Sequence, residues 1–181
     1  MHSFWIRANA VFFFALGVLA GLAALNVASI YPIPQNDPVM NQLRVHELRR
    51  LHKHRGYDRA VLTVDLDVDL TPVWTWNTKQ IFLFVMVEYK TSKTRNSIVI
   101  YDMIIRDEKD AHIKGVDLIK YPITEEASSS SLLDVELELK FGYEIHPLFG
   151  PLQLFGTGRK SIAYPKNDIM PVTYTFPTVY N

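Results

Sequence analysis

The sequence contains no cysteine, and its 19 basic residues are matched by 19 acidic residues. The absence of cysteine excludes disulfide bonds, thiol nucleophiles and cysteine-ligated zinc sites. A formal net charge of zero argues against the basic surface typical of nucleic-acid-binding proteins and against an acidic solvating tail. At 181 residues the chain is long enough for one domain of ordinary size with additional segments. We therefore expect no nucleic-acid partner.

One uncharged run of twenty residues lies near the N-terminus, from Val11 to Ile30. As a helix rising about 1.5 Å per residue it would be about 30 Å long, which is the thickness of the hydrocarbon core of a bilayer. Eleven of its residues are Leu, Ile, Phe or Val, and their summed insertion free energy of about −3 to −7 kcal/mol outweighs the polar Asn26 and Ser29. The run predicts a single transmembrane signal-anchor helix over residues 11–30.

A cleaved signal peptide is the alternative, with Arg7 before the apolar run and a small-residue cleavage site at Val27-Ala28-Ser29. The run is longer than the roughly 7–15 apolar residues typical of a signal peptide, which favours a retained anchor. Orientation is less clear, because Arg44, Arg49 and Arg50 follow the run within about 20 residues. Charge counting alone would favour a cytoplasmic C-terminal domain.

Residues 31–59 are predicted to form a linker followed by a basic segment. The first part, YPIPQNDP, carries three prolines, too many for a continuing helix. Residues 43–59 then hold six Arg or Lys side chains and three histidines. They predict either a solvated strand or short helix with a polar turn, or a surface that contacts anionic lipid headgroups or an acidic partner. His52-x-His54 lacks a third ligand at a convincing spacing, so we expect no metal there.

The rest of the chain reads as β-structure. Apolar residues alternate strictly with polar ones from Leu62 to Leu70 and again within LLDVELELKF (132–141), where Lys140 is among the residues expected to face outward. Ile81–Tyr89 is apolar on both faces and predicts a central strand covered on both sides. The remaining predicted strands are Ser97–Arg106, Val116–Tyr121, Arg159–Tyr164 and Val172–Phe176. Many short strands separated by turn residues predict a mainly β fold, an antiparallel β-sandwich.

No pattern in the sequence predicts a catalytic or cofactor-binding site. Asp65-x-Asp67-x-Asp69 resembles the start of a calcium loop but lacks its later glycine and glutamate, and the three carboxylates would share one side of a strand. There is no G-x-S-x-G elbow and no S-x-x-K motif. A triad assembled from distant residues stays possible, with His112 and His146 as the histidines of the predicted domain. We expect no catalytic residue, no cofactor and no metal.

One stretch resembles a known family. Leu70 to Gln80, LTPVWTWNTKQ, runs directly into IFLFVMVEY and resembles the central signature of signal peptidase complex subunit 3, W-N-x-K-Q followed by an apolar strand and E-Y. Weaker similarity extends from Met1-His2 through Asn96–Asp102 to the Pro, Leu and Gly residues at 147–158. Two departures are the absence of any N-x-S/T glycosylation site and a poor match over residues 107–131.

This resemblance implies a single-pass type II protein of the endoplasmic reticulum membrane. Its parts would be a cytosolic N-terminus (1–10), the anchor (11–30), the linker and basic segment (31–59) and a luminal β-sandwich (60–181). It implies an accessory, non-catalytic subunit of the complex that cleaves signal peptides from nascent secretory proteins. Its partners would be the catalytic serine-peptidase subunit, the other subunits and the membrane lipid. The alternatives are a β-sandwich binding module whose signal peptide is removed, and an independent hydrolase with a dispersed triad.

The W-N-x-K-Q turn is the candidate site, and two interpretations stay open for it. In the first the turn is structural: Asn77 forms the turn, and Trp74 or Trp76 fills the core. In the second, Trp76, Lys79 and Gln80 belong to the surface that docks the catalytic subunit, since aromatic residues are enriched at interface hot spots. The partner-interface candidates are Trp76, Asn77, Lys79 and Gln80.

Overall fold

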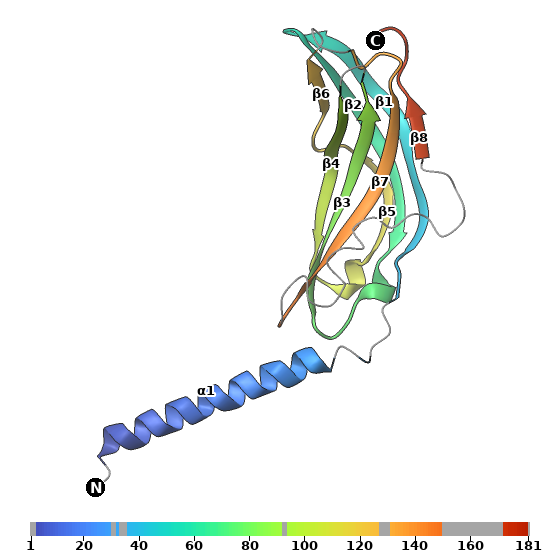
Figure 1. Ribbon diagram of the computed structural model, residues 1–181. Coiled ribbons are helices and arrows are strands. Elements are labelled where there is room, and N and C mark those ends of the chain that lie inside the picture. Colours follow the sequence, from blue (N-terminus) through green and yellow to red (C-terminus); the bar gives the residue numbers. More distant parts are fainter. Residues whose placement is uncertain are drawn as a thin grey trace.

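The computed structural model of the chain describes residues 3–29, 32, 36–91, 94–126, 131–149 and 172–180. It consists of one N-terminal helix followed by two β-sheets (Figure 1). The predicted strand Arg159–Tyr164 lies outside the described residues.

Helix α1 (Phe4–Ala28) covers the predicted membrane segment, residues 11–30, as far as Ala28. It begins seven residues before Val11, because Phe4, Trp5 and Ile6 continue the apolar character of the run. None of its residues is buried, and apolar side chains occupy every side of the helix. At about 1.5 Å per residue its 25 residues extend about 37 Å. In length and composition α1 can cross a bilayer.

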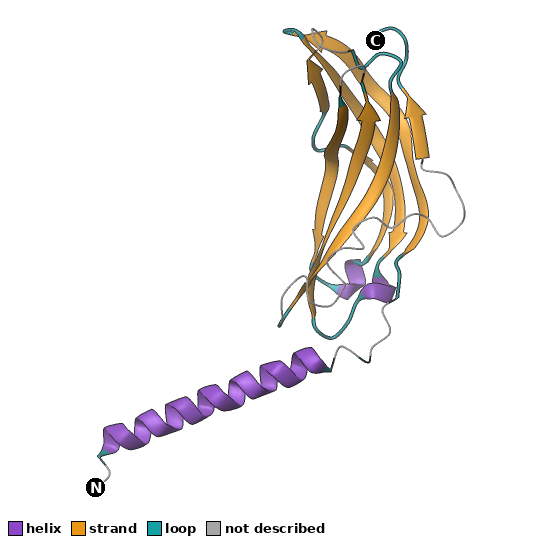
Figure 2. Cartoon of the chain, in the orientation of Figure 1, coloured by secondary structure: helices purple, strands orange, loops and turns teal. Residues whose placement is uncertain are grey.

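The strands form two four-stranded sheets, and the described strands pair antiparallel throughout (Figure 2). The first sheet has the order β1-β2-β5, and β6 also pairs with β2. Its strands are β1 (Val39–His54), β2 (Tyr57–Asp69), β5 (His112–Leu118) and β6 (Ile123–Glu126). The second sheet has the order β4-β3-β7-β8. Its strands are β3 (Thr78–Lys90), β4 (Arg95–Ile105), β7 (Glu136–Pro147) and β8 (Val172–Thr175).

The core lies between the two sheets, and it confirms the predicted antiparallel β-rich fold. On β2 the alternating apolar residues from Leu62 to Val68 are buried, and Asp58, Thr63 and Asp67 are buried as well. On β3 the odd-numbered residues from Ile81 to Tyr89 are buried. Because successive residues of a strand point to opposite faces, each sheet contributes one apolar row to this core. Its central members are Leu62, Val64, Leu66, Val68, Ile81, Leu83, Val85, Val87, Leu137, Leu139 and Phe141.

Strand β1 shows that the basic segment belongs to the sheet. The strand begins at Val39, whereas we expected the sandwich to begin at residue 60. Its pairing with β2 shifts register three times, between Met40 and Gln42, between Val45 and Glu47, and between Leu48 and Arg50. Each shift adds one residue to β1, so its inward apolar residues recur at intervals of three as well as two. This irregular spacing hides the strand from a search for strict alternation.

Two further expectations about individual strands are corrected. Strand β3 is central in its sheet, but only one of its faces is covered: Phe82, Phe84 and Met86 on the outer face are half-buried. Strand β7 begins at Glu136, after Asp134 adopts a left-handed conformation with φ 58°. Lys140 of β7 was expected to face solvent, yet its side chain is only 9% exposed.

Lys140 is held there by an ion pair, with Nζ 2.8 Å from a carboxylate oxygen of Glu88 on the neighbouring strand. Glu88 also accepts from Arg95 at 2.9 Å. The hydrogen bond from Lys140, together with that from Arg95, lowers the pKa of Glu88. The outer face of this sheet therefore carries a paired charge cluster at one end and an aromatic row at the other.

A buried carboxylate joins three segments at the end of the sandwich far from α1. Asp58 of β2 is fully buried, and its oxygens accept hydrogen bonds from the Ser131 hydroxyl (3.0 Å), the Leu132 amide (3.0 Å) and the Tyr180 hydroxyl (2.9 Å). Burying a carboxylate costs free energy unless its oxygens are hydrogen-bonded, so these three donors stabilise Asp58 in its buried position.

Candidate docking surface

The W-N-x-K-Q turn connects the two sheets, leading from β2 into β3. Its entry is fixed by the Asp69 side chain, which accepts a hydrogen bond from the Thr71 amide (2.9 Å). A short 3₁₀ helix, η1 (Thr71–Val73), follows, with Pro72 in its first turn where no amide donor is needed. The Leu70 amide donates to Ala111 O (3.0 Å), which ties the start of the turn to the segment before β5.

Two threonines close the second half of the turn. The Thr75 amide donates to the Thr78 hydroxyl oxygen (3.0 Å), and the Thr78 amide donates to Thr75 O (2.8 Å). Hydroxyl side chains stabilise turns in this way by replacing backbone partners. Trp76 and Asn77 are therefore held between two fixed residues at the start of β3.

Asn77 is the buried centre of this arrangement, with an exposed fraction of 2%. Its Nδ2 donates to Phe149 O (2.9 Å), and its Oδ1 accepts from the Phe149 amide (3.1 Å). Its own carbonyl accepts from the Leu148 amide (2.7 Å). Three hydrogen bonds thus join the turn to the end of β7, a segment 72 residues away in sequence. Asn77 thus lies inside the turn and joins it to the segment after β7.

The joined segments present three large apolar side chains to solvent. Trp76 is 50% exposed, Leu148 53% and Phe149 49%. We call these three residues the apolar tip. Trp74, by contrast, is partly buried and packs against the core, so the two tryptophans of the turn have different environments. Exposed apolar side chains grouped in this way are typical of protein or membrane interaction sites.

The other two candidate residues begin the outer face of the second sheet. Lys79 is exposed, and Gln80 is half-buried opposite His146 of β7. Gln80 shares its side of β3 with Phe82 and Phe84, whose ring centroids are 5.7 Å apart. The four candidates therefore lie on one turn but differ in role: Trp76 and Lys79 face solvent, Gln80 borders the sheet face, and Asn77 is internal.

The apolar tip lies at the end of the sandwich from which α1 departs. Figure 1 shows η1 and the start of β3 at that end, and the hairpin between β1 and β2 at the opposite one. Nine residues separate Ser29 from Val39, so the connection of ten Cα–Cα steps spans at most about 35 Å. A partner that reaches the apolar tip therefore lies near the membrane in which α1 would be anchored.

Leu148 and Phe149 were missed by sequence reasoning. An apolar pair directly after Pro147 at the end of a strand was the available signal. Their contact with Asn77 depends on the pairing of β3 with β7, which neither segment reveals alone.

Two of the three aspartates of the D-x-D-x-D stretch are paired with side chains of neighbouring strands. Asp65 accepts from Gln42 (2.7 Å) and pairs with Arg44 (2.9 Å). Asp67 accepts from Asn41 (3.1 Å) and lies 3.2 Å from both His112 Nε2 and Lys114 Nζ. The hydrogen bond from Asn41, followed by that from His112, lowers the pKa of Asp67 to about 2.

The described residues include no group of three or more His, Asp or Glu side chains placed to hold a metal ion. Among the same residues, serine hydroxyls donate hydrogen bonds to a backbone carbonyl, a thioether and a carboxylate, and none donates to a histidine. The exposed side chains of the apolar tip form a surface that a partner could contact.

Comparison with known proteins identifies what the chain resembles. The sequence profile of a family described as "Signal peptidase subunit" matches residues 1–167. A Dictyostelium discoideum protein named Signal peptidase complex subunit 3 is 32% identical over 166 residues, covering 91% of this chain and 95% of that protein. Proteins of the same name from Saccharomyces cerevisiae and Gallus gallus are 32% identical over 127 residues and 26% over 171. The yeast match covers 67% of this chain and 68% of the relative, and the chicken match 91% and 95%.

Proposed function

The chain belongs to the signal peptidase subunit family, and from that membership we propose that it is an accessory, non-catalytic subunit of a signal peptidase complex. Its task is to hold the catalytic serine-peptidase subunit in place while that subunit cleaves signal peptides. The observation that carries the proposal is the apolar tip, because three hydrogen bonds of the buried Asn77 join the two segments that carry three exposed apolar side chains.

The exposure of the apolar tip favours a docking role over a purely structural one. Burying an apolar side chain is favourable by about 25 cal/mol per Å² removed from water, and half of the Trp76 surface remains available for this. Tryptophan is also among the residues most enriched at interface hot spots. Lys79 and Gln80 lie beside it and supply polar contacts at the rim of the same surface. Asn77 contributes by fixing the turn.

We place α1 in the endoplasmic reticulum membrane with the N-terminus cytosolic and the β-sandwich in the lumen. Fewer positive charges oppose this orientation than were counted from the sequence, because α1 ends at Ala28. Arg49 and Arg50 then lie more than 20 residues beyond its end, outside the range that determines orientation. Arg44, which stays within that range, is paired with Asp65 in the folded sheet.

The docking surface is tested by comparing two exposed aromatic residues at opposite ends of the sandwich. Full-length Trp76→Ala and Tyr57→Ala are each purified in mild detergent, and the amount of catalytic subunit that accompanies them is measured. Tyr57 is 49% exposed, which matches Trp76 in accessibility. We expect Trp76→Ala to retain much less of the catalytic subunit, with an unchanged thermal transition, and Tyr57→Ala to retain as much as the native chain. Equal retention by both variants would refute docking through the tip.

The non-catalytic role has its own test. We expect the purified chain alone to leave a signal-peptide substrate intact, and cleavage to appear when the catalytic subunit is added. Cleavage by the isolated chain would show instead that it is a hydrolase with a dispersed active site.

A further inference from the structure

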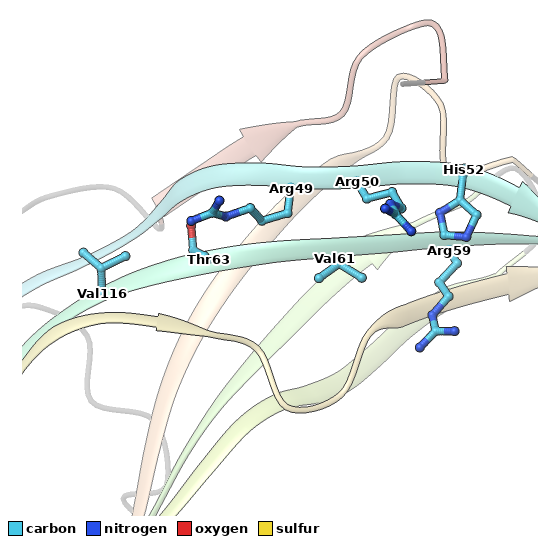
Figure 3. A pocket seen from close by; sticks show the side chains of 7 residues that line it. All are labelled: Arg49, Arg50, His52, Arg59, Val61, Thr63 and Val116. Carbon is cyan, nitrogen blue, oxygen red and sulfur yellow. The ribbon is translucent and has the colours of Figure 1, made fainter.

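A basic groove crosses the outer face of the first sheet near the β1–β2 hairpin. Its volume is about 710 Å³. Figure 3 shows the side chains that line it: Arg49, Arg50 and His52 from β1, Arg59, Val61 and Thr63 from β2, and Val116 from β5. We call it the basic groove. Among the described residues that form its lining, none is acidic.

The strand register concentrates the positive charge. His52 lies opposite Arg59, and Arg50 lies opposite Val61, so Arg50 and Arg59 are diagonal neighbours on one face of the sheet. Consecutive residues of a regular strand point to opposite faces. The register shift between Leu48 and Arg50 breaks that rule, and both Arg49 and Arg50 consequently line the groove.

Within the described part of the chain these charges are only partly compensated. Arg49 forms an ion pair with Glu47 (3.2 Å), in which both side chains are more than half exposed. Arg50 and Arg59 form no ion pair with another described residue. Nδ1 of His52 is buried and has no hydrogen-bond partner in the described residues. Adjacent like charges and an unsatisfied polar atom are features that a bound ligand relieves.

From this geometry we infer that the basic groove binds an acidic segment of a partner polypeptide. Arginine forks bind carboxylates through two parallel hydrogen bonds, and three of them line one groove. Val61 and Val116 add an apolar floor against which the aliphatic parts of glutamate side chains pack. A polypeptide is long enough to contact all three arginines at once.

The position of the groove disfavours a bilayer as its ligand. Arg49 lies ten residues along β1 from Val39, so about 30 Å separates it from the end of the strand nearest α1. Electrostatic attraction to headgroups decays over about 8 Å at physiological ionic strength.

This inference goes beyond the proposed function and is independent of it. The groove is lined by residues of β1, β2 and β5, whereas the apolar tip is formed by the turn before β3 and the segment after β7. The two surfaces share no residue, so a variant of one leaves the other in place. Loss of the catalytic subunit in Trp76→Ala would therefore not alter peptide binding at the groove.

The test measures binding of a fluorescent ten-residue glutamate-rich peptide to the full chain in neutral detergent, by fluorescence anisotropy at physiological salt. We expect Arg50→Gln/Arg59→Gln to weaken binding about tenfold, since the double variant removes two of the three arginines that line the groove. The matched control, Arg106→Gln/Lys109→Gln, removes the same charge from exposed residues at the other end of the sandwich and should bind as the native chain does.

Further arms distinguish the possible ligands. A glutamine-rich peptide should not bind, and affinity for the acidic peptide should fall as salt rises. Neither inorganic phosphate at equal charge concentration nor mixed micelles containing anionic lipid should displace the peptide. Absence of peptide binding, equal weakening in both double variants, or displacement of the peptide by anionic mixed micelles or phosphate would overturn the inference.

Discussion

Replacement of Asn77 by alanine should destabilise the fold, because this buried side chain holds the segments of the apolar tip in place. Replacement of an exposed residue of the tip should not. The change deletes two side-chain hydrogen bonds, to Phe149 N and to Phe149 O, at a position that is 2% exposed. Each bond is worth about 1 kcal/mol net, and leaving its backbone partners poorly satisfied adds about 1 kcal/mol more. We therefore expect the free energy of unfolding to fall by about 3 kcal/mol.

For a domain of this size that loss corresponds to a decrease of about 10 °C in the melting temperature. The assay is thermal unfolding of the full-length chain in detergent, followed by tryptophan fluorescence. Asn77→Asp is the matched variant: it keeps an oxygen to accept from the Phe149 amide but places a second acceptor against Phe149 O, so it should be no more stable than Asn77→Ala. Trp76→Ala, at an exposed position, should change stability by less than about 0.5 kcal/mol. A melting temperature of Asn77→Ala within 2 °C of the native value would refute the structural role of the side chain.

Three other predictions address topology and stability. Lys90→Asn creates an Asn-x-Ser acceptor with Thr91 and Ser92 at an exposed strand end, so a luminal domain should gain one endoglycosidase-sensitive glycan, and Lys90→Gln should gain none. Asp58→Ala leaves three donors without their acceptor and should lower the free energy of unfolding by about 3 kcal/mol in chemical denaturation; a change below about 1 kcal/mol would contradict this. Because the pKa of Asp67 is lowered from 3.8 to about 2, its stabilising contribution is complete above pH 4 and is lost as the pH falls toward 2. The native melting temperature should therefore fall more steeply between pH 4 and 2 than that of Asp67→Asn, and parallel curves would show that the carboxylate contributes nothing.

The regular parts of the fold could be predicted from the sequence because their physical signals are local. An uncharged run predicts a helix able to cross a membrane, and strict alternation from Leu62 to Leu70 predicts a strand with one buried face. Both features are present in the structure. The antiparallel β-rich fold followed from the number of such strands and the turns between them.

What could not be predicted depends on register and on distant contacts. The bulges of β1 change the spacing of Val45, Leu48 and Leu51 to three residues, a helix-like interval in a strand. The burial of Lys140 requires Glu88 on the adjacent strand, and polar alternation alone places it in solvent.

The candidate site shows the same division between local and distant information. Its motif identified the turn, and the choice between structural and docking roles required the exposed fraction of each residue. Trp74 packs on the core, Asn77 is internal and Trp76 is exposed. The other half of the apolar tip is supplied by Leu148 and Phe149, whose place beside the turn follows only from the pairing of β3 with β7.

Native mass spectrometry of the full-length chain, purified in mild detergent, tests the central claim most directly. If the chain is an anchored scaffold for a peptidase, the particle should contain this polypeptide with its N-terminal helix intact and one copy of a serine-peptidase subunit. A soluble, solitary species that begins near residue 30 would contradict both the anchor and the accessory role.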